Sequence, residues 1–245
     1  MNKRAWLGII AVLAFSLVVA LLFMPSLVRA GSAVDGVLPP QANPAGHSYA
    51  EWNAKWFQWA FGLSTDQFGS VFTGEEVDCK VGQSGRVWFL AGTFDGIPAQ
   101  RSCTIPTGKF LLMPIVNIAY VVFASDPPET QTEEFAREQA NLDFYLEDAT
   151  LAATVDGNAV ENIEAFRVDS ADTPIFDVAL PEDNWLGITS DNCPVIDGAL
   201  VCSPAAADGY YLLLAPLSPG EHIVHVSATG GLFEQDVTYQ LTVKP

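Results

Sequence analysis

Few residues in this chain combine the types and the spacing that catalysis needs. A nucleophilic serine or cysteine requires a histidine and an orienting acid, but the chain has 3 histidines and no G-x-S-x-G elbow. Ser84, between Gln83 and Gly85, is therefore interpreted as a loop residue. His222 and His225 have H-x-x-H spacing, but residues three apart on a strand point to opposite faces, so we do not expect them to share a metal ion.

Carboxylate and amide side chains are concentrated between residues 183 and 208, and oxygen ligands of this kind suit calcium. No other cofactor is expected. The spacing is not that of an EF-hand, so solvated turn residues are the alternative interpretation. Paired carboxylates for glycoside hydrolysis are a further hypothesis, although the sequence does not show which acids face each other. The predicted calcium ligands are Asp183, Asp191, Asp197 and Asp208, with Asn184 and Asn192 beside them.

An aromatic amphipathic helix is predicted over residues 48–62. Ser48 and Glu51 have the spacing of a capping box, and His47 is placed to pack on Trp52. At helical spacing the aromatic residues fall on one stripe, which is either buried core, as we favour, or a surface that stacks on sugar rings or a protein partner. The binding residues predicted on this stripe and near it are Tyr49, Trp52, Trp56, Trp59, Trp88, Asn117 and Tyr120.

The N-terminus has the features of a secretory signal peptide over residues 1–30: a basic start, an apolar run and small residues before Gly31. We expect cleavage after Ala30 and an exported, extracellular or cell-envelope protein. An uncleaved leader is the alternative, and the membrane would then be contacted only through it. Residues 31–46, rich in Gly, Pro and Ala, are expected to form an extended tether before a single domain over residues 47–245.

The charge is strongly acidic, with a formal net value of −18 at pH 7. A field of this sign repels phosphates, so nucleic acid is excluded as an expected partner. The acids are dispersed along the chain, which is typical of a solvated surface, whereas binding of a cation or of a basic partner is the alternative.

Four cysteines in an exported chain predict two disulfides. Three connectivities are formally open, and we choose the local pairs Cys79 with Cys103 and Cys193 with Cys202. A zinc site is the competing interpretation, but no two cysteines have C-x-x-C spacing and the histidines lie far from them in the sequence.

The rest of the chain is typical of strands joined by turns. Residues 86–94 and 100–105 are expected to form a hairpin, and residues 109–124 either two core strands or one long strand with Pro114 at a bulge or an edge. Asp156-Gly157-Asn158 is a further hairpin signal, and residues 175–180 are another strand. A second helix is predicted over residues 130–148, capped by Thr130 and Glu133.

Residues 64–78 and 184–207 are expected to be loops, and the chain should end in a meander over 210–215, 221–228 and 232–243. Short strands with turn chemistry between them predict a mainly β protein, a β-sandwich or jelly roll on which the two helices pack.

Two segments together resemble a group of uncharacterised exported bacterial proteins. They are the helix Tyr49-x-Glu51-Trp52-x-Ala54-x-Trp56-x-x-Trp59 and the run from Cys79 to Phe94, C-x-V-G-Q-S-G-x-V-W-F-L-A-G-T-F. Cys103-Thr104-Ile105-Pro106 and the turn Pro219-Gly220-Glu221-His222 fit as well. The resemblance implies secretion and a shared fold, but no activity and no functional residue.

Three functional hypotheses follow. The first is a non-catalytic exported binding or surface protein with a carbohydrate or an envelope protein as its partner. The second is a secreted hydrolase that uses paired carboxylates, with calcium as a stabilising ion. The third is a structural subunit of the cell envelope.

Overall fold

The computed structural model describes residues 34–245 except 75, 95, 147–148 and 233. The predicted leader, residues 1–30, lies outside the described residues. The described part of the expected tether is bonded to the domain, because Val37 forms an antiparallel bridge with Leu214 and the Leu38 amide donates to the Leu213 carbonyl at 2.8 Å. None of the helices in the described ranges has the length and apolarity of a membrane span.

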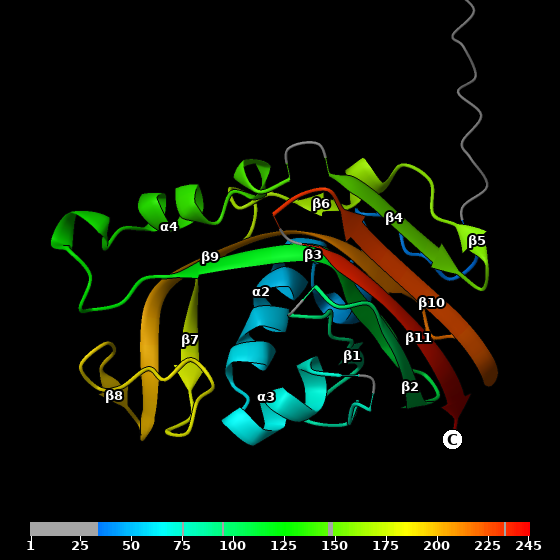
Figure 1. The fold of residues 1–245 in the computed structure, drawn as a ribbon, viewed down its shortest axis with the longest axis horizontal. Coiled ribbons are helices and arrows are strands. Elements are labelled where there is room, and N and C mark those ends of the chain that lie inside the picture. Colours follow the sequence, from blue (N-terminus) through cyan, green and yellow to red (C-terminus); the bar gives the residue numbers. More distant parts are fainter. Residues whose placement is uncertain (1–33, 75, 95, 147–148, 233) are drawn as a thin grey trace, which may run out of the picture. The chain divides into compact units, whose positions relative to one another are not determined.

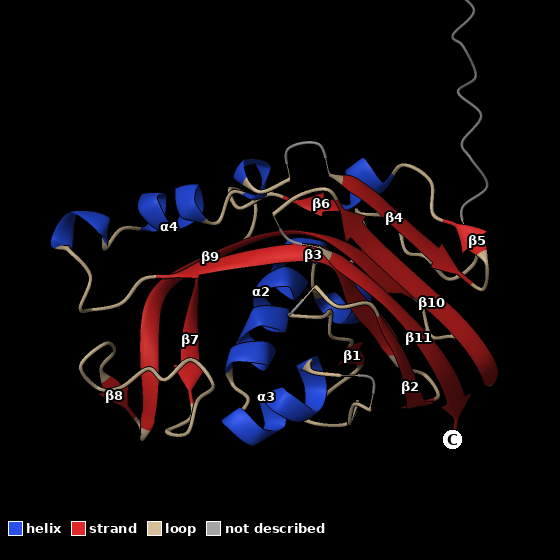
Figure 2. Ribbon diagram, in the orientation of Figure 1, coloured by secondary structure: helices blue, strands red, loops and turns tan. Residues whose placement is uncertain are grey.

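Two curled mixed sheets make up most of the fold, as Figure 2 shows, which confirms the prediction of a mainly β, sandwich-like protein. The first sheet has the order β1-β3-β9-β6, and β7 and β8 also pair with β9. Its strands are β1 (Val87–Phe89), β3 (Phe110–Val121), β6 (Arg167–Val168), β7 (Phe176–Leu180), β8 (Val195–Ile196) and β9 (Ala199–Leu214).

The second sheet has the order β2-β11-β10-β4-β5. Its strands are β2 (Ala99–Pro106), β4 (Thr150–Val155), β5 (Asn158–Ala159), β10 (Gly220–Thr229) and β11 (Gln235–Lys244). Burial alternates along β11, as expected for a strand with one face on the core. The β4–β5 hairpin turns at Asp156 and Gly157, as predicted from the sequence.

Helices lie on both sides of the curled sheets (Figure 1). In that view α2 (Tyr49–Phe61) and α3 (Thr65–Phe72) lie beneath the arch formed by the strands, and α4 (Glu133–Gln139) lies on its outer side. Short 3-10 turns are found at η1 (Pro44–Gly46), η2 (Pro128–Thr130), η3 (Leu142–Phe144) and η4 (Ile163–Phe166).

Helix α2 begins as its sequence predicts. Ser48 and Glu51 form a complete capping box, with the Ser48 amide donating to Glu51 at 2.8 Å. The His47 ring meets the edge of Trp52, with 5.1 Å between the ring centroids. Local sequence therefore fixes the position at which α2 begins and the direction in which the chain enters it.

Strand β3 is one long strand that bends at Pro114. Its pairing with β9 shifts register between Pro114 and Val116, which is the bulge that a proline inside a strand requires. The carbonyls of Pro114 and Ile115 both accept from the Gln235 amide nitrogen, at 2.9 and 2.7 Å. A side chain from the second sheet thus provides hydrogen bonds to the carbonyls at the bulge in the first sheet.

The predicted hairpin of residues 86–94 with 100–105 is wrong. Strand β1 pairs in parallel with β3, and β2 pairs in parallel with β11 in the other sheet. Both predicted disulfides are present, and Cys79–Cys103 joins β2 to the segment that precedes β1 rather than the arms of a hairpin. Parallel partners are distant in sequence, so no turn signal between neighbouring strands could reveal them.

Four boundaries also differ from the prediction. The helix expected over 130–148 is only α4, capped by Thr132 in place of Thr130. Residues 64–78 contain α3, whose capping box of Ser64 and Gln67 is readable in the sequence. The loop expected over 184–207 ends where β9 begins at Ala199, and β9 pairs with β3, so only β10 and β11 remain of the predicted C-terminal meander.

Candidate functional site: an aromatic groove

The aromatic stripe of α2 is buried, and its polar atoms are occupied by the backbone. Tyr49 donates to the Leu38 carbonyl at 2.7 Å, and the indole nitrogens of Trp52, Trp56 and Trp59 donate to carbonyls at 3.0 to 3.2 Å. A buried indole needs such an acceptor, so each ring is fixed in orientation. The stripe is core, as favoured from the sequence, and whether it also binds a ligand stays a prediction.

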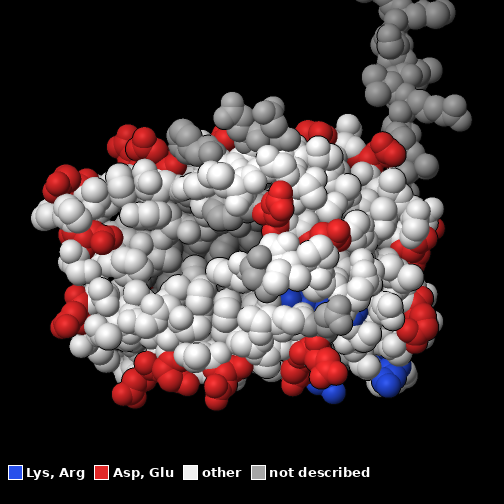
Figure 3. Space-filling model, in the orientation of Figure 1, with Lys and Arg blue, Asp and Glu red and all other residues white. Residues whose placement is uncertain are grey.

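One side of this core opens into a groove with a cavity volume of about 960 Å³. Its walls come from α2 and α3, from the second half of β3, and from residues 92–94, 96, 185–186, 231–232 and 234–235. Figure 3 shows a hollow on this face that is surrounded mostly by residues without charge. Three apolar side chains of the lining are exposed to solvent: Phe94 (63 %), Leu232 (77 %) and Leu186 (37 %).

Stacked rings form the lower wall of the groove. Trp185 stacks on Phe68, at 3.9 Å between ring centroids, and is nearly parallel to Phe61, at 6.0 Å. Its indole nitrogen donates to the Ala60 carbonyl at 3.3 Å. The indole of Trp185 is therefore held in place by ring stacking and by a backbone acceptor, and it lines the groove.

A buried arginine holds two walls of the groove together. Arg101 is 0 % exposed, and its guanidinium donates to the carbonyls of Phe72, Gly74, Ala91 and Gly92 and to the Tyr239 hydroxyl, at 3.0 to 3.2 Å. The carbonyls of Phe72 and Gly74 lie at the end of α3, where the helix dipole favours a cation. Arg101 therefore positions α3 against the loop that follows β1.

A polar relay runs from the groove into the core. The Asn117 amide donates to the Tyr211 hydroxyl at 3.0 Å, and this hydroxyl donates to Asn53 at 2.5 Å. The Asn53 amide donates to Thr173 at 2.9 Å, and the Thr173 hydroxyl donates to the Asp169 carbonyl at 3.2 Å. Burial raises the pKa of Tyr211 well above its ordinary value, so its phenol stays neutral and keeps its proton for Asn53.

The predicted binding residues are divided by the structure. Trp56, Asn117 and Tyr120 line the groove. Tyr49, Trp52, Trp59 and Trp88 are buried among other residues, and the Trp88 indole nitrogen has no hydrogen-bond partner among the described residues. Sequence reasoning missed Phe94, Trp185 and Gln235, which reach the groove from three separate loops or strand ends, and no spacing rule joins them.

The four predicted calcium ligands are not gathered. Among the described residues, no group of three or more His, Cys, Asp or Glu side chains is placed to hold a metal ion. Asp183 lends its backbone carbonyl to Thr65, and Asp197 occupies a left-handed turn position between β8 and β9. Calcium binding at Asp183, Asp191, Asp197 and Asp208 thus has no support from the geometry and stays a prediction.

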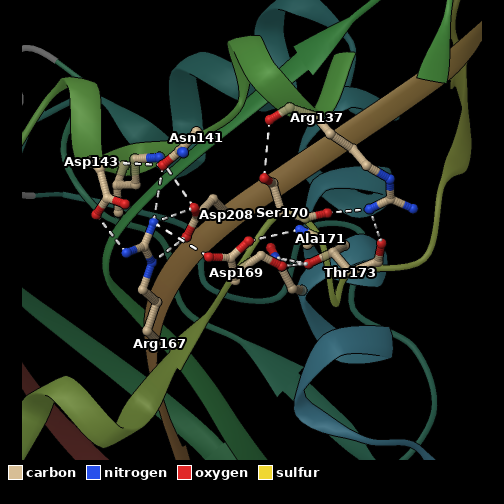
Figure 4. Close-up of polar contacts among 11 residues, drawn as sticks. Arg137, Asn141, Asp143, Arg167, Asp169, Ser170, Ala171, Thr173 and Asp208 are labelled. Carbon is tan, nitrogen blue, oxygen red and sulfur yellow. Dashed lines mark hydrogen bonds and ion pairs between the residues drawn. The ribbon is translucent and has the colours of Figure 1, made fainter. Parts of the chain in front are cut away.

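Asp208 is instead the buried half of an ion pair, drawn in Figure 4. It is 0 % exposed, and its carboxylate accepts from Arg167 at 2.8 Å and from the Leu142 amide at 3.1 Å. Asp143 and Asp169 also lie beside Arg167. The hydrogen bond to Asp208 raises the pKa of Arg167 against the opposing effect of burial. These ion pairs connect β6 and η3 to β9. The charge of Arg167 is balanced by the carboxylates around it.

The C-terminal histidines have separate partners. His225 contacts Asp236 at 2.9 Å, and His222 contacts Asp156 at 2.7 Å. The other His222 ring nitrogen lies 2.9 Å from the Ser218 carbonyl and 3.4 Å from the Ser218 hydroxyl. Burial opposes the charged ring, but the hydrogen bonds that the ring donates to Asp156 and to the Ser218 carbonyl outweigh it and raise the pKa of His222. With acceptors beside both nitrogens, the surroundings of His222 favour the protonated ring, which donates from both nitrogens.

Comparisons with protein-family models, with curated proteins and with solved structures find no match for this chain. The resemblance to uncharacterised exported proteins therefore stays an expectation from the sequence, and the site has to be interpreted from its own geometry.

Proposed function

We propose that this protein is a non-catalytic binding protein of an oxidising compartment outside the cytoplasm, and that its aromatic groove takes a ligand with an apolar body. The observation that carries the proposal is the groove itself: a hollow of about 960 Å³ walled by aromatic rings. Pockets of this size, mostly apolar with a few convergent polar groups, are typical of small-molecule sites. Two disulfides, Cys79–Cys103 and Cys193–Cys202, are typical of exported proteins.

The exposed rim supports ligand binding rather than simple core packing. Seven large hydrophobic side chains are exposed in the described part of the chain, and three of them, Phe94, Leu186 and Leu232, border this one hollow. Apolar side chains that gather around a concavity mark interaction sites more often than scattered ones do. Burying Phe94 and Leu232 under a ligand would stabilise a complex by roughly 1.5 to 3 kcal/mol for each side chain.

An apolar ligand fits this groove better than a sugar. Sugar rings stack on the open face of an aromatic side chain, whereas Trp185 already stacks on Phe68 at 3.9 Å between ring centroids, and Trp56 is 3 % exposed. Carbohydrate recognition at this site stays a hypothesis that the same binding experiment can test.

The test is titration of the purified protein with the neutral fluorescent probe N-phenylnaphthylamine. We expect a saturable rise in emission with the wild type. The double variant Phe94→Ser/Leu232→Ser should weaken the affinity by about tenfold or more, because two apolar contacts are lost. The matched control is Val195→Ser/Ile196→Ser, which removes two exposed apolar side chains of β8, outside the groove. Equal weakening by both double variants, or no saturable binding by the wild type, would refute the proposal.

The hydrolase hypothesis has one observation in its favour, since the carboxylates of Asp126 and Glu234 both line the groove. Chromogenic aryl glycosides offered to the same protein test it. Turnover by the wild type that is lost in Asp126→Asn would make the groove an active site rather than a binding site.

A further inference from the structure

Two amide side chains of the groove, Asn117 and Gln235, are held through their nitrogens, which leaves an acceptor oxygen on each for a ligand. From this property and from the charge of the lining, we infer that the groove selects a cationic amphiphile, with an apolar body and a head group that donates hydrogen bonds, such as a primary alkylammonium. The inference rests on the proposed function and names the chemical class of its ligand.

The orientation of Asn117 is dictated from the far end of the polar relay. The Asp169 carbonyl can only accept, so the Thr173 hydroxyl donates to it and accepts from the Asn53 amide nitrogen. The Asn53 oxygen then faces Tyr211, whose hydroxyl must donate to it. That hydroxyl is left to accept from the Asn117 amide nitrogen.

Each step of the relay thus fixes the next, and the last residue, Asn117, lines the groove. One N–H of its amide is engaged with Tyr211, and its oxygen takes no part in the relay and can accept from a ligand. An oxygen of this kind pairs with an N–H or O–H group and repels another acceptor.

Gln235 is oriented by the same logic. Its amide nitrogen donates to the carbonyls of Pro114 and Ile115 at the β3 bulge, and a carbonyl can pair only with a donor. The side chain is 8 % exposed and packs against Gly92, where an added Cβ would lie 1.7 Å from the Gln235 oxygen. Gln235 therefore cannot reverse its amide, and it also offers an oxygen at the groove wall.

The charges of the groove have one sign. Among the described lining residues, Asp126 and Glu234 are the charged ones, and neither Lys nor Arg is present. The nearest guanidinium of the wall, Arg101, is engaged by four carbonyls and a hydroxyl. A carboxylate or sulfate head group would meet acceptors and like charge, whereas an ammonium would meet partners of opposite charge.

The remaining polar groups agree with this ligand class. The Thr93 hydroxyl is buried without a hydrogen-bond partner among the described residues, and Tyr120 also lines the groove. A hydroxyl accepts as well as it donates, so both can receive an N–H group.

The experiment compares ligands that share one dodecyl chain and differ in the head group, each displacing N-phenylnaphthylamine below its micelle-forming concentration. We expect dodecylammonium to bind most tightly, dodecyltrimethylammonium to bind less tightly because it has charge but no N–H donor, and dodecanoate to bind weakest. The affinity for dodecylammonium should exceed the affinity for dodecanoate by about tenfold or more, because charge-assisted hydrogen bonds are stronger than neutral ones.

Neutralising the two carboxylates of the groove distinguishes their direct effect on the ligand from the effect of the net negative charge of the whole protein. Asp126→Asn/Glu234→Gln should remove most of the preference for dodecylammonium while the neutral probe still binds. The matched control, Glu161→Gln/Asp172→Asn, changes the net charge equally at exposed positions outside the groove and should keep the preference.

The outcomes distinguish the two proposals. If the neutral probe binds but dodecanoate binds as tightly as dodecylammonium, or if both double variants lose the preference equally, the charge inference is overturned and the binding function stands. If the neutral probe does not bind to the wild type, the proposed function fails, and this inference fails with it.

Discussion

Removal of one buried hydroxyl tests the polar relay directly. In Tyr211→Phe the ring and its packing are kept, but the oxygen that accepts from Asn117 at 3.0 Å and donates to Asn53 at 2.5 Å is lost. Tyr211 is 0 % exposed, so no water takes the place of the hydroxyl unless the core opens.

The expected cost follows from the burial of the two partners. Asn53 is also 0 % exposed, and its oxygen would be left without a donor, which costs about 1 to 3 kcal/mol. Asn117 is half-buried and lines the groove, so water can replace its lost partner at little cost. We therefore expect the free energy of unfolding to fall by about 1 to 3 kcal/mol.

The assay is urea unfolding followed by circular dichroism, with the disulfides intact. Tyr210→Phe is the matched control, because the neighbouring ring is half-buried and its hydroxyl is outside the relay. The slope against urea should be unchanged, so that a shift in the midpoint reports stability. If the two variants differ by less than about 0.5 kcal/mol, the Tyr211 hydroxyl is not an obligatory donor and the assigned direction of the relay is wrong.

Three other perturbations have defined outcomes. Arg101→Lys should lower the free energy of unfolding by about 2 kcal/mol or more and weaken binding of the neutral probe. The reason is that an ammonium cannot reach all the acceptors that the guanidinium holds. Unchanged binding would contradict the role of Arg101 in the groove wall. Cys79→Ser/Cys103→Ser should cost about 3 kcal/mol, from the loop of 24 residues that the disulfide closes, and urea unfolding without reductant measures it. His222→Gln should destabilise the protein more at about pH 5.5 than at about pH 9. Because the pKa of His222 is raised in the folded protein, its contribution to stability is complete below its pKa in the unfolded chain, about 6.5, and is lost as the pH rises through its pKa in the folded protein. The lowered pKa of Asp156 contributes stability that is lost only in acid. An equal loss of unfolding free energy at both pH values would show that the His222–Asp156 ion pair is not the cause of the destabilisation.

Sequence reasoning succeeded where a structural signal is complete within a few residues. The capping box of Ser48 and Glu51 predicts the start of α2, Pro114 predicts a bulge, and the turn at Asp156 predicts the β4–β5 hairpin. It failed for α3, whose capping box of Ser64 and Gln67 was masked by polar, turn-forming neighbours.

Sequence reasoning also failed where partners are far apart in the chain. The parallel pairing of β1 with β3 and of β2 with β11 has no turn to announce it, and the hairpin expected between β1 and β2 is wrong for that reason. The groove depends on the same long-range contacts, since Asn117 and Gln235 come from strands of different sheets.

By itself the sequence determined the acidic charge, the number of possible cystines, the aromatic helix and the mainly β class, because each depends on composition or on short spacing. Only the tertiary structure decided that the tryptophans are core, that Asp208 pairs with Arg167 instead of facing a loop, and that a groove opens beside α2. The reason is physical: burial and donor direction are properties of the surroundings of a side chain, and in this fold those surroundings come from strands and loops that are distant in the chain.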